Sequence, residues 1–267
     1  MDKEKIKMYQ VDAFTDTLFS GNPAAVCILD KWLDDELMQS IAYENNLAET
    51  AFVVSKGKEF EIRWFTPTVE VDLCGHATLA AGFVLFDQYR YPDSKIQFYS
   101  LRSGLLPVER NQEWIILDFP SDPIQPLSVE YFAIMEKCIG MKVLGVYKGK
   151  TDYITLVENE KCLQTLQANY NEIAKLDARG LVVTAKGDNV DFVSRFFAPQ
   201  SGIDEDPVTG SAHTSLTPLW ATKLNKTNMI ARQLSKRGGY LQCEYQGERC
   251  LIAGQAKLYL MGEINLI

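Results

Sequence analysis

The chain has 267 residues, with 27 basic and 35 acidic side chains, which gives a formal net charge of −8. An apolar fraction of 46% and a charged fraction of 23% are typical of a globular protein with a large core, and they exclude disordered and fibrous classes. Because the acidic balance repels phosphate backbones, we expect no nucleic-acid partner.

The N-terminal stretch MDKEKIKMYQVDAF carries charges but lacks the apolar segment and cleavage site of a secretory signal. The longest uninterrupted apolar stretch, Ala80–Phe86, is too short to span a bilayer. We therefore expect a cytoplasmic protein with no membrane partner.

The first part of the chain predicts a helix, a hairpin and a second helix. Asp34–Tyr43 is amphipathic and opens with acidic residues, as helix starts do. The runs Thr50–Val54 and Phe60–Phe65 read as two strands joined by a glycine turn. The helix that begins at His76 is apolar on nearly all sides, which predicts a helix enclosed by sheet.

A proline-rich stretch, Phe119–Ser128, is a plausible stiff junction. It predicts two domains, residues 1–119 and 120–267. The amphipathic stretch Val129–Cys138 is expected to be the second domain's counterpart of the helix Asp34–Tyr43.

The second part repeats the hairpin and helix of the first. Leu181–Thr184 and Val190–Phe197 read as strands, and a glycine loop then opens a helix that Pro218 should bend or reposition. Three similar strings occur in the same order, at spacings of 129, 132 and 135 residues, and their matched positions are Val54 with Val183, Arg63 with Arg195, and Gly75 with Gly210. The order of these matches indicates a duplicated unit.

The copies differ in their chemical groups, and this difference selects candidate site residues. The offset of 129 places Glu49 opposite Ala178, and the glycine match places His76 opposite Ser211. Glu49 is either a solvated rim residue or, in an apolar cleft, a general acid or base. His76 is either a backbone-bonded residue or a site residue.

The loops at Gly75 and Gly210 each open a helix, and the N–H groups of a helix start attract anions. Neither loop has a nucleotide-binding motif, so a carboxylate is the expected ligand. The alternative is that both glycines only permit tight turns. Asp206, just before the second loop, is either a site residue or a helix N-cap. Ser211 lacks the context of a hydrolase nucleophile.

Four motifs in this order resemble the phenazine-biosynthesis PhzF-like family, which has the diaminopimelate epimerase-like fold. They are FSGNPAAV (Phe19–Val26), NLAETAF (Asn46–Phe52), FTPTVEVDLCGHATLA (Phe65–Ala80) and EDPVTGSAH (Glu205–His213). The resemblance implies an α+β fold of two similar halves, each a curved, mostly antiparallel sheet wrapped around a central helix. It also implies an active site in the cleft between the halves.

Carried over by motif, the resemblance makes Glu49 the acid and base that transfers a proton. It places His76, Asp206 and Ser211 in the site, with the helix starts at Gly75 and Gly210 binding a substrate carboxylate. The implied activity is a cofactor-independent isomerisation, like that of a dihydro-hydroxyanthranilate in phenazine synthesis. The family also suggests a homodimer.

Two features of the cysteines and histidines limit the alternatives. The six cysteines form no C-x-x-C pair and the two histidines have no metal-ligand spacing, so no metal is expected. Related epimerases use two facing cysteines; Cys74 matches one position, but no cysteine occurs between Asp204 and Ala212. A two-thiol racemase is therefore disfavoured, and Cys74 is interpreted as a packed thiol. A non-catalytic carboxylate-binding protein and an epimerase that uses Glu49 with another acid remain as alternatives.

Overall fold

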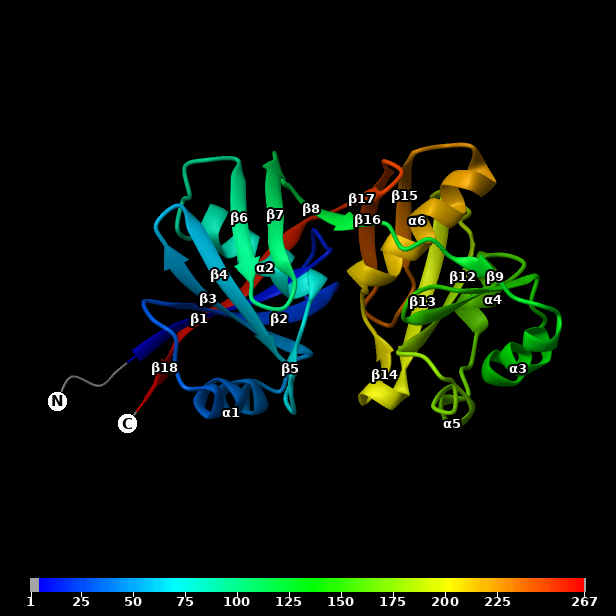
Figure 1. Ribbon diagram of the computed structural model, residues 1–267, viewed down its shortest axis with the longest axis horizontal. Coiled ribbons are helices and arrows are strands. Elements are labelled where there is room, and N and C mark those ends of the chain that lie inside the picture. Colours follow the sequence, from blue (N-terminus) through cyan, green and yellow to red (C-terminus); the bar gives the residue numbers. More distant parts are fainter. Residues whose placement is uncertain (1–4, 267) are drawn as a thin grey trace. The chain divides into compact units, whose positions relative to one another are not determined.

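The computed structural model describes residues 5–266, and the chain folds as two compact units (Figure 1). The first unit contains the chain up to Asp118 and the segment from Ala253 onward, and the second contains Phe119–Ile252. The sequence-based boundaries instead assigned the whole C-terminal segment to the second domain. Tertiary pairing groups this segment with the first unit, because its strand, red in Figure 1, is antiparallel to the first strand of the chain. Residues 1–4 and residue 267 of the predicted domains lie outside the described range.

The first unit is built around a mixed sheet. Its elements are β1 (Lys5–Ala13), β2 (Asn22–Leu29), α1 (Asp35–Asn45), β3 (Glu49–Lys56), β4 (Glu59–Phe65), β5 (Glu70–Val71), α2 (Gly75–Asp87), β6 (Lys95–Ser100), β7 (Gly104–Asn111), most of β8 (Trp114–Pro120) and β18 (Ala256–Asn265). The strands pair in the order β18–β1–β2–β3–β4–β6–β7–β8, with β5 beside β4. Only β2–β3 and β4–β6 are parallel among these pairs.

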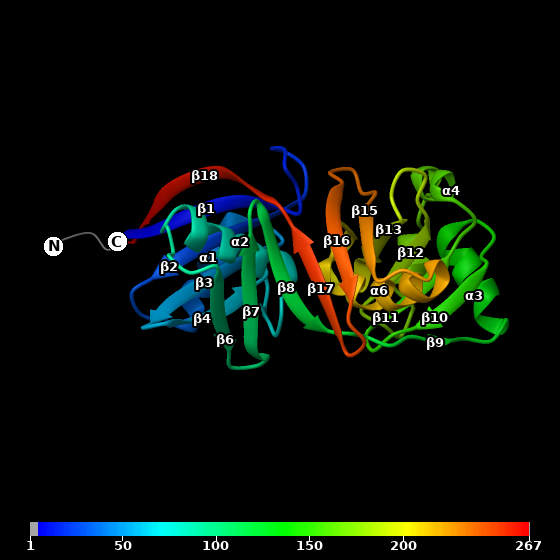
Figure 2. The same ribbon diagram turned by 90° about the horizontal axis from the view of Figure 1, so that it is seen from above.

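The second unit has a similar set of strands. Its elements are β9 (Gln125–Pro126), α3 (Glu130–Ile139), β10 (Gly145–Lys148), β11 (Asp152–Leu156), α4 (Glu160–Thr165), α5 (Tyr170–Ile173), β12 (Gly180–Lys186), β13 (Phe192–Ala198), the 3-10 turn η1 (Pro199–Ser201), β14 (Ile203–Asp206), α6 (Gly210–Leu224), β15 (Asn228–Gln233), β16 (Gly239–Tyr245) and most of β17 (Arg249–Gly254). The strands β9–β10–β11–β12–β13–β15–β16 pair in that order, with β14 beside β13. Figure 2 shows β15 beside β16 here, and β6 beside β7 in the first unit.

Both predicted hairpins are present, as β3–β4 and β12–β13. In each unit an arginine of the second hairpin strand binds a glutamate of the following short strand through two hydrogen bonds. Arg63 donates from Nε and Nη2 to Glu70 at 2.7 and 2.9 Å, and Arg195 donates to Glu205 at the same distances. This bidentate pair, called the arginine fork below, ties the end of the hairpin to the chain that leads into α2 or α6.

The strand register corrects one expected correspondence between the copies. Glu49 is the first residue of β3 and lies opposite Ala24 in the parallel pair β2–β3. Gly180 is the first residue of β12 and lies opposite Asp152 in the parallel pair β11–β12. Gly180, and not Ala178, therefore occupies the position of Glu49, because the offset of 129 taken from the valine runs is two residues out of register.

The helix correspondence expected from amphipathic patterning is also wrong. α1 lies between β2 and β3, whereas α3 precedes β10, and the short helices α4 and α5 lie between β11 and β12. Amphipathic helices resemble one another in sequence wherever they stand, so only their position among the paired strands separates α1 from α3.

Helix α2 is the central element of the first unit. Eleven of its thirteen residues are buried, and it packs against β1, β2, β3, β7 and β18. Its apolar character on nearly all sides follows from this enclosure, as the sequence indicated. No helix among the described residues is long and apolar enough to cross a membrane.

Helix α6 continues through Pro218. Because proline has no N–H, the carbonyl of Thr214 one turn earlier loses its helical donor. Two groups of the second unit approach that oxygen instead: the N–H of Asp122 at 3.2 Å and the thiol of Cys250 at 3.7 Å. The proline is therefore accommodated by tertiary hydrogen bonds without ending the helix.

Candidate active site

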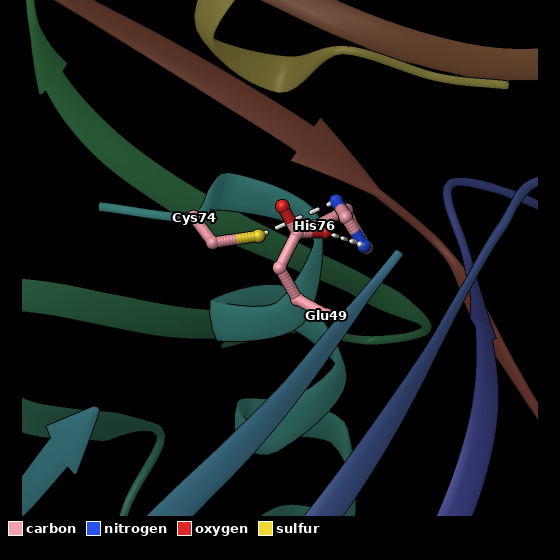
Figure 3. A group of neighbouring side chains, drawn as sticks. All are labelled: Glu49, Cys74 and His76. Atoms are coloured by element: carbon pink, nitrogen blue, oxygen red, sulfur yellow. Dashed lines mark hydrogen bonds and ion pairs between the residues drawn. The ribbon is translucent and has the colours of Figure 1, made fainter. Parts of the chain in front are cut away.

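The first unit gathers Glu49, Cys74 and His76 at the start of α2 (Figure 3). Cys74 is the N-cap residue of α2 and His76 is the second residue of the helix. Oε2 of Glu49 lies 3.2 Å from Nε2 of His76, and Sγ of Cys74 lies 3.4 Å from Nδ1 of the same ring. The two nitrogens of one imidazole therefore face different groups. The contact with Glu49 is close but poorly aligned for a hydrogen bond.

Local chain geometry delivers Glu49 to this place. Helix α1 ends at Asn46, which adopts the left-handed conformation typical of a helix end and donates its N–H to the carbonyl of Ala42. Three residues later the chain enters β3 at Glu49. The side chain of Glu49 is only 14% exposed, so the carboxylate is largely shielded from water.

Burial determines the charge state of His76. The residue is 6% exposed, and desolvation lowers its pKa to about 3 because a buried imidazolium loses its hydration. The ring is therefore neutral near pH 7, with one nitrogen protonated and the other able to accept. A neutral imidazole beside Glu49 is therefore not a counter-ion of the carboxylate.

Asn22 belongs to the same cluster, although the sequence assigned it no role. Its side-chain Nδ2 lies 3.3 Å from Nδ1 of His76, and the residue is fully buried. Gly21, with φ of +68°, precedes it, and a Cβ there would collide with the carbonyl oxygen of Ala13. The signal in the sequence is the short Gly21–Pro23 turn, whose flanking glycine and proline restrict the backbone on both sides of a polar residue.

Glu49, Cys74 and His76 are also ligand types that zinc uses, and their ligand atoms lie within 4.8 Å of one another. In this arrangement, however, Cys74 is beside Nδ1 and Glu49 is beside Nε2. One ion could not bind both groups and a single ring nitrogen without a rearrangement of the ring. The geometry fits an acid–base cluster better than a metal site.

The second unit places Asp206 in a buried turn. Asp206 ends β14, and its Oδ2 accepts a 2.5 Å hydrogen bond from the hydroxyl of Thr209. Thr209, not Asp206, is the N-cap residue of α6. The side chain of Gln233 binds the carbonyl of Asp206 at 2.8 Å and the N–H of Thr209 at 2.9 Å. Gln233 thus fixes this turn, and nothing in its sequence context pointed to that role.

Ser211 is bound by an arginine of the same unit. Its hydroxyl accepts a 2.9 Å hydrogen bond from Nη1 of Arg179. The same guanidinium binds Asp152 through Nε at 3.0 Å and Nη2 at 2.5 Å, and Asp152 is 2% exposed. Sequence reasoning also missed Arg179, whose signal is a charged residue directly before the strand start at Gly180.

The structure thus unites some of the predicted residues. Glu49 and His76 contact each other, and Gly75 lies between Cys74 and His76 in the first turn of α2. In the second unit Gly210 and Ser211 begin α6, as predicted. The guanidinium of Arg179, which binds Ser211, also interacts electrostatically with Asp206, so these two predicted residues share a neighbour.

The second histidine of the chain has a separate environment. His213 is fully buried in α6, its Nδ1 lies 2.9 Å from the carbonyl oxygen of Thr209, and its ring packs on Phe192. Because a carbonyl oxygen only accepts, the proton of this ring is on Nδ1. His213 therefore serves the packing of the second unit.

Comparison with known proteins extends over nearly the whole chain. The family model described as phenazine biosynthesis-like protein matches residues 11–262. An uncharacterized isomerase of Pseudomonas aeruginosa is 50% identical over 262 residues, which cover 98% of this chain and 99% of that protein. A crystal structure of a PhzF-family phenazine biosynthesis protein from Enterococcus faecalis is 45% identical, with a TM-score of 0.93 over 98% of this chain and all of that one.

A more distant structure informs only on the fold. A hydroxyproline epimerase from Agrobacterium vitis has 10% identity and a TM-score of 0.65, with 99% of this chain and 94% of that chain covered. The fold is therefore a mixed α/β arrangement with few helices that is shared with epimerases. The sequence motifs, the family model and the relatives of nearly equal length all indicate the same family. This chain belongs to the phenazine biosynthesis-like PhzF family.

Proposed function

We propose that the protein is an isomerase that moves a proton between carbons of a small carboxylate-bearing substrate, with Glu49 as the acid and base. The observation that carries this proposal is the shielded carboxylate of Glu49, 3.2 Å from the neutral ring of His76. Relatives of nearly equal length from Pseudomonas aeruginosa and Halalkalibacterium halodurans are named isomerases, which supports the reaction class.

The chemistry needs one group that is first a base and then an acid. The carboxylate of Glu49 takes a proton from an acidic carbon, so that an O–H bond forms as the C–H bond breaks. The electron pair moves into the conjugated system of the substrate. The same O–H then protonates a second carbon, which restores the carboxylate and shifts the double bonds. No cofactor takes part in this sequence of steps. Burial suits such a residue, since a shielded acid–base group interacts more strongly with charge that develops in the transition state.

Two predictions from the sequence belong to this proposal. The N–H groups of the first helical turns, near Gly75 and Gly210, are predicted to hold the substrate carboxylate. Asp206 and Ser211 are predicted to orient the same molecule. Substitution Ser211→Ala tests this assignment, because a binding role predicts a higher KM for the substrate.

The internal repetition supports a further proposal about the fold. The order β3–β4–β5–α2–β6–β7 recurs as β12–β13–β14–α6–β15–β16, with the arginine fork at the same point. We propose that the two units are copies of one diaminopimelate epimerase-like unit.

The function is tested with a dihydro-hydroxyanthranilate in deuterated water, together with a panel of small unsaturated carboxylates. Proton NMR follows deuterium incorporation and the shift of the double bonds. Glu49→Gln keeps the size of the side chain but removes the base, and it should reduce turnover on the order of 10² or more. Full isomerisation by Glu49→Gln would show that another residue is the base.

The matched control is Glu44→Gln, which makes the same change at an exposed position of α1 and should leave turnover unaltered. A wild-type protein that binds members of the panel but exchanges no proton would favour the non-catalytic alternative. A product of inverted configuration, without a shifted double bond, would identify an epimerase.

A further inference from the structure

The ring of His76 lies between groups of opposite hydrogen-bonding character. Nδ2 of Asn22, 3.3 Å from Nδ1, carries only hydrogens to donate. The thiol of Cys74, 3.4 Å from the same nitrogen, is a second available donor. On the other side, a carboxylate oxygen of Glu49 lies 3.2 Å from Nε2 and only accepts when it is ionised.

These contacts select one tautomer of a neutral ring. If the proton were on Nδ1, it would point at the amide hydrogens of Asn22, and the lone pair of Nε2 would face the carboxylate of Glu49. With the proton on Nε2, each contact joins a donor to an acceptor or to a negative charge. The low pKa of the ring, about 3, removes the third state in which both nitrogens are protonated near pH 7.

We propose that Asn22 is a positioning residue that holds the proton of His76 on Nε2 and thereby keeps Glu49 as a carboxylate ready to act as base. Cys74 assists as a thiol donor to the same nitrogen. The catalytic consequence rests on the proposed function of Glu49, whereas the tautomer itself does not.

The position of Asn22 is built to hold this amide in place. Asn22 begins β2 and pairs with Ala13 of β1, and no part of the residue is exposed to solvent. The left-handed turn at Gly21 brings the chain against the carbonyl of Ala13, where no other side chain fits. A buried amide on a paired strand has little rotational freedom, so its donor stays aimed at the ring.

Replacement of the donor by an acceptor should reverse the arrangement. Asn22→Asp has nearly the same shape, but its carboxylate accepts from Nδ1. The Nε2–H bond then breaks and an Nδ1–H bond forms, and Glu49, now beside a bare nitrogen, takes up a proton from water. Alternatively, the ring gains a second proton from water between its two carboxylate neighbours. In either case the resting state with a neutral ring protonated on Nε2 is lost.

The test is a long-range proton–nitrogen NMR spectrum of protein labelled with ¹⁵N-histidine. The chain has only two histidines, so His76→Gln assigns both rings. In the wild type at pH 7 we expect His76 to be protonated on Nε2 and His213, which donates to Thr209, on Nδ1. His213 thus gives an internal reference for the opposite tautomer.

Asn22→Asp should move the His76 signals to the Nδ1–H or the doubly protonated pattern and leave His213 unchanged. Asn111→Asp, the same change at an exposed position of β7, is the matched control and should alter neither ring. Cys74→Ala should retain the Nε2–H form, because the amide of Asn22 is still present.

A wild-type His76 protonated on Nδ1 would overturn the proposal, as would an Asn22→Asp protein with unaltered His76 signals. If Asn22→Asp does not fold, the wild-type and Cys74→Ala spectra decide: loss of the Nε2–H form in Cys74→Ala would assign the role to the thiol. Turnover of the dihydro-hydroxyanthranilate by Asn22→Asp should fall on the order of 10². The two proposals can fail separately. If the NMR spectra show the expected tautomers but Glu49→Gln has wild-type turnover, the proposed function is refuted and the tautomer assignment stands.

Discussion

The two units share the arginine fork, but they differ at the first residue of the first hairpin strand, which is β3 in one unit and β12 in the other. Arg63 and Arg195 bind their glutamates with the same two distances, and each guanidinium lies 5.0–5.1 Å from the aromatic ring two residues further on. At the strand start, by contrast, the first unit has Glu49 and the second has Gly180. The arginine fork is therefore present in both units, while the residue at the strand start differs between them.

Steric space explains why the second unit has no counterpart of Glu49. A Cβ on Gly180 would lie 2.5 Å from Cζ of Phe196 and 2.7 Å from the carbonyl oxygen of Phe197. Only glycine fits there, and the neighbouring Arg179 instead presents a cation to Asp152 and Ser211. A carboxylate therefore lies beside an imidazole at the start of β3, whereas the start of β12 follows a guanidinium that binds a hydroxyl.

The largest effect on the free energy of unfolding is expected when the arginine of either fork is removed. Arg63→Ala and Arg195→Ala each remove the bidentate partner of a partly buried glutamate that is 16–17% exposed, and Glu70 keeps only its contact with the more exposed Arg102. Loss of these charged hydrogen bonds should cost about 1.5–3 kcal/mol. The loss should be greater for Arg195→Ala, because Arg195 also donates to the carbonyls of Leu163 and Leu166 at 3.0 and 2.8 Å. Urea unfolding of the two variants measures both losses of stability.

The control for the fork is Arg232→Ala, at an exposed position of β15, which should change the free energy of unfolding by less than about 0.5 kcal/mol. If both fork variants behaved like this control, the repeated arginine would be a surface feature without a structural role.

The second prediction concerns Gly180, the position at which the two units differ. Gly180→Ala should reduce the free energy of unfolding by about 1–3 kcal/mol, because the added methyl group must displace a phenylalanine ring and a backbone carbonyl. Gly262→Ala is the control, since its Cβ would meet only Leu260 at 3.7 Å. Equal urea midpoints for the two variants would refute the steric explanation.

The smallest expected effect is on the pH dependence of stability, and it comes from the single histidine of each unit. Burial lowers the pKa of His76 to about 3 and that of His213 to about 4, from an ordinary value of 6.5. As the pH falls below 6.5 the unfolded chain therefore takes up protons that the folded chain excludes. The stability contributed by the neutral rings is complete above pH 6.5 and decreases toward pH 3–4.

Each histidine should contribute a slope of up to about 1.4 kcal/mol per pH unit in that window. Urea unfolding between pH 7 and pH 5 should show a shallower pH dependence in His76→Gln and in His213→Gln than in the wild type. An unchanged slope in His213→Gln would mean that this ring does not stay neutral in the folded protein.

Much of the fold could be predicted because its signals are local. The alternation of Phe60–Phe65, the apolar surface of the helix after His76 and the repeated Arg and Gly positions are properties of short segments. Residue correspondence could not be predicted to the same accuracy. A two-residue error placed Ala178 opposite Glu49, because similar valine runs can be matched in more than one register.

The sequence by itself determined that the chain contains a repeated hairpin and helix, that Glu49 and His76 are the candidate acid–base groups, and that the motifs are those of the PhzF family. Only the tertiary structure decided which side chains meet. Asn22 and His76 are 54 residues apart, Arg179 and Ser211 are 32 apart, and neither contact has a periodic signal. Periodicity records which face of a segment is buried, whereas hydrogen-bond partners depend on strand register and loop geometry, which are set by the packing of the whole unit.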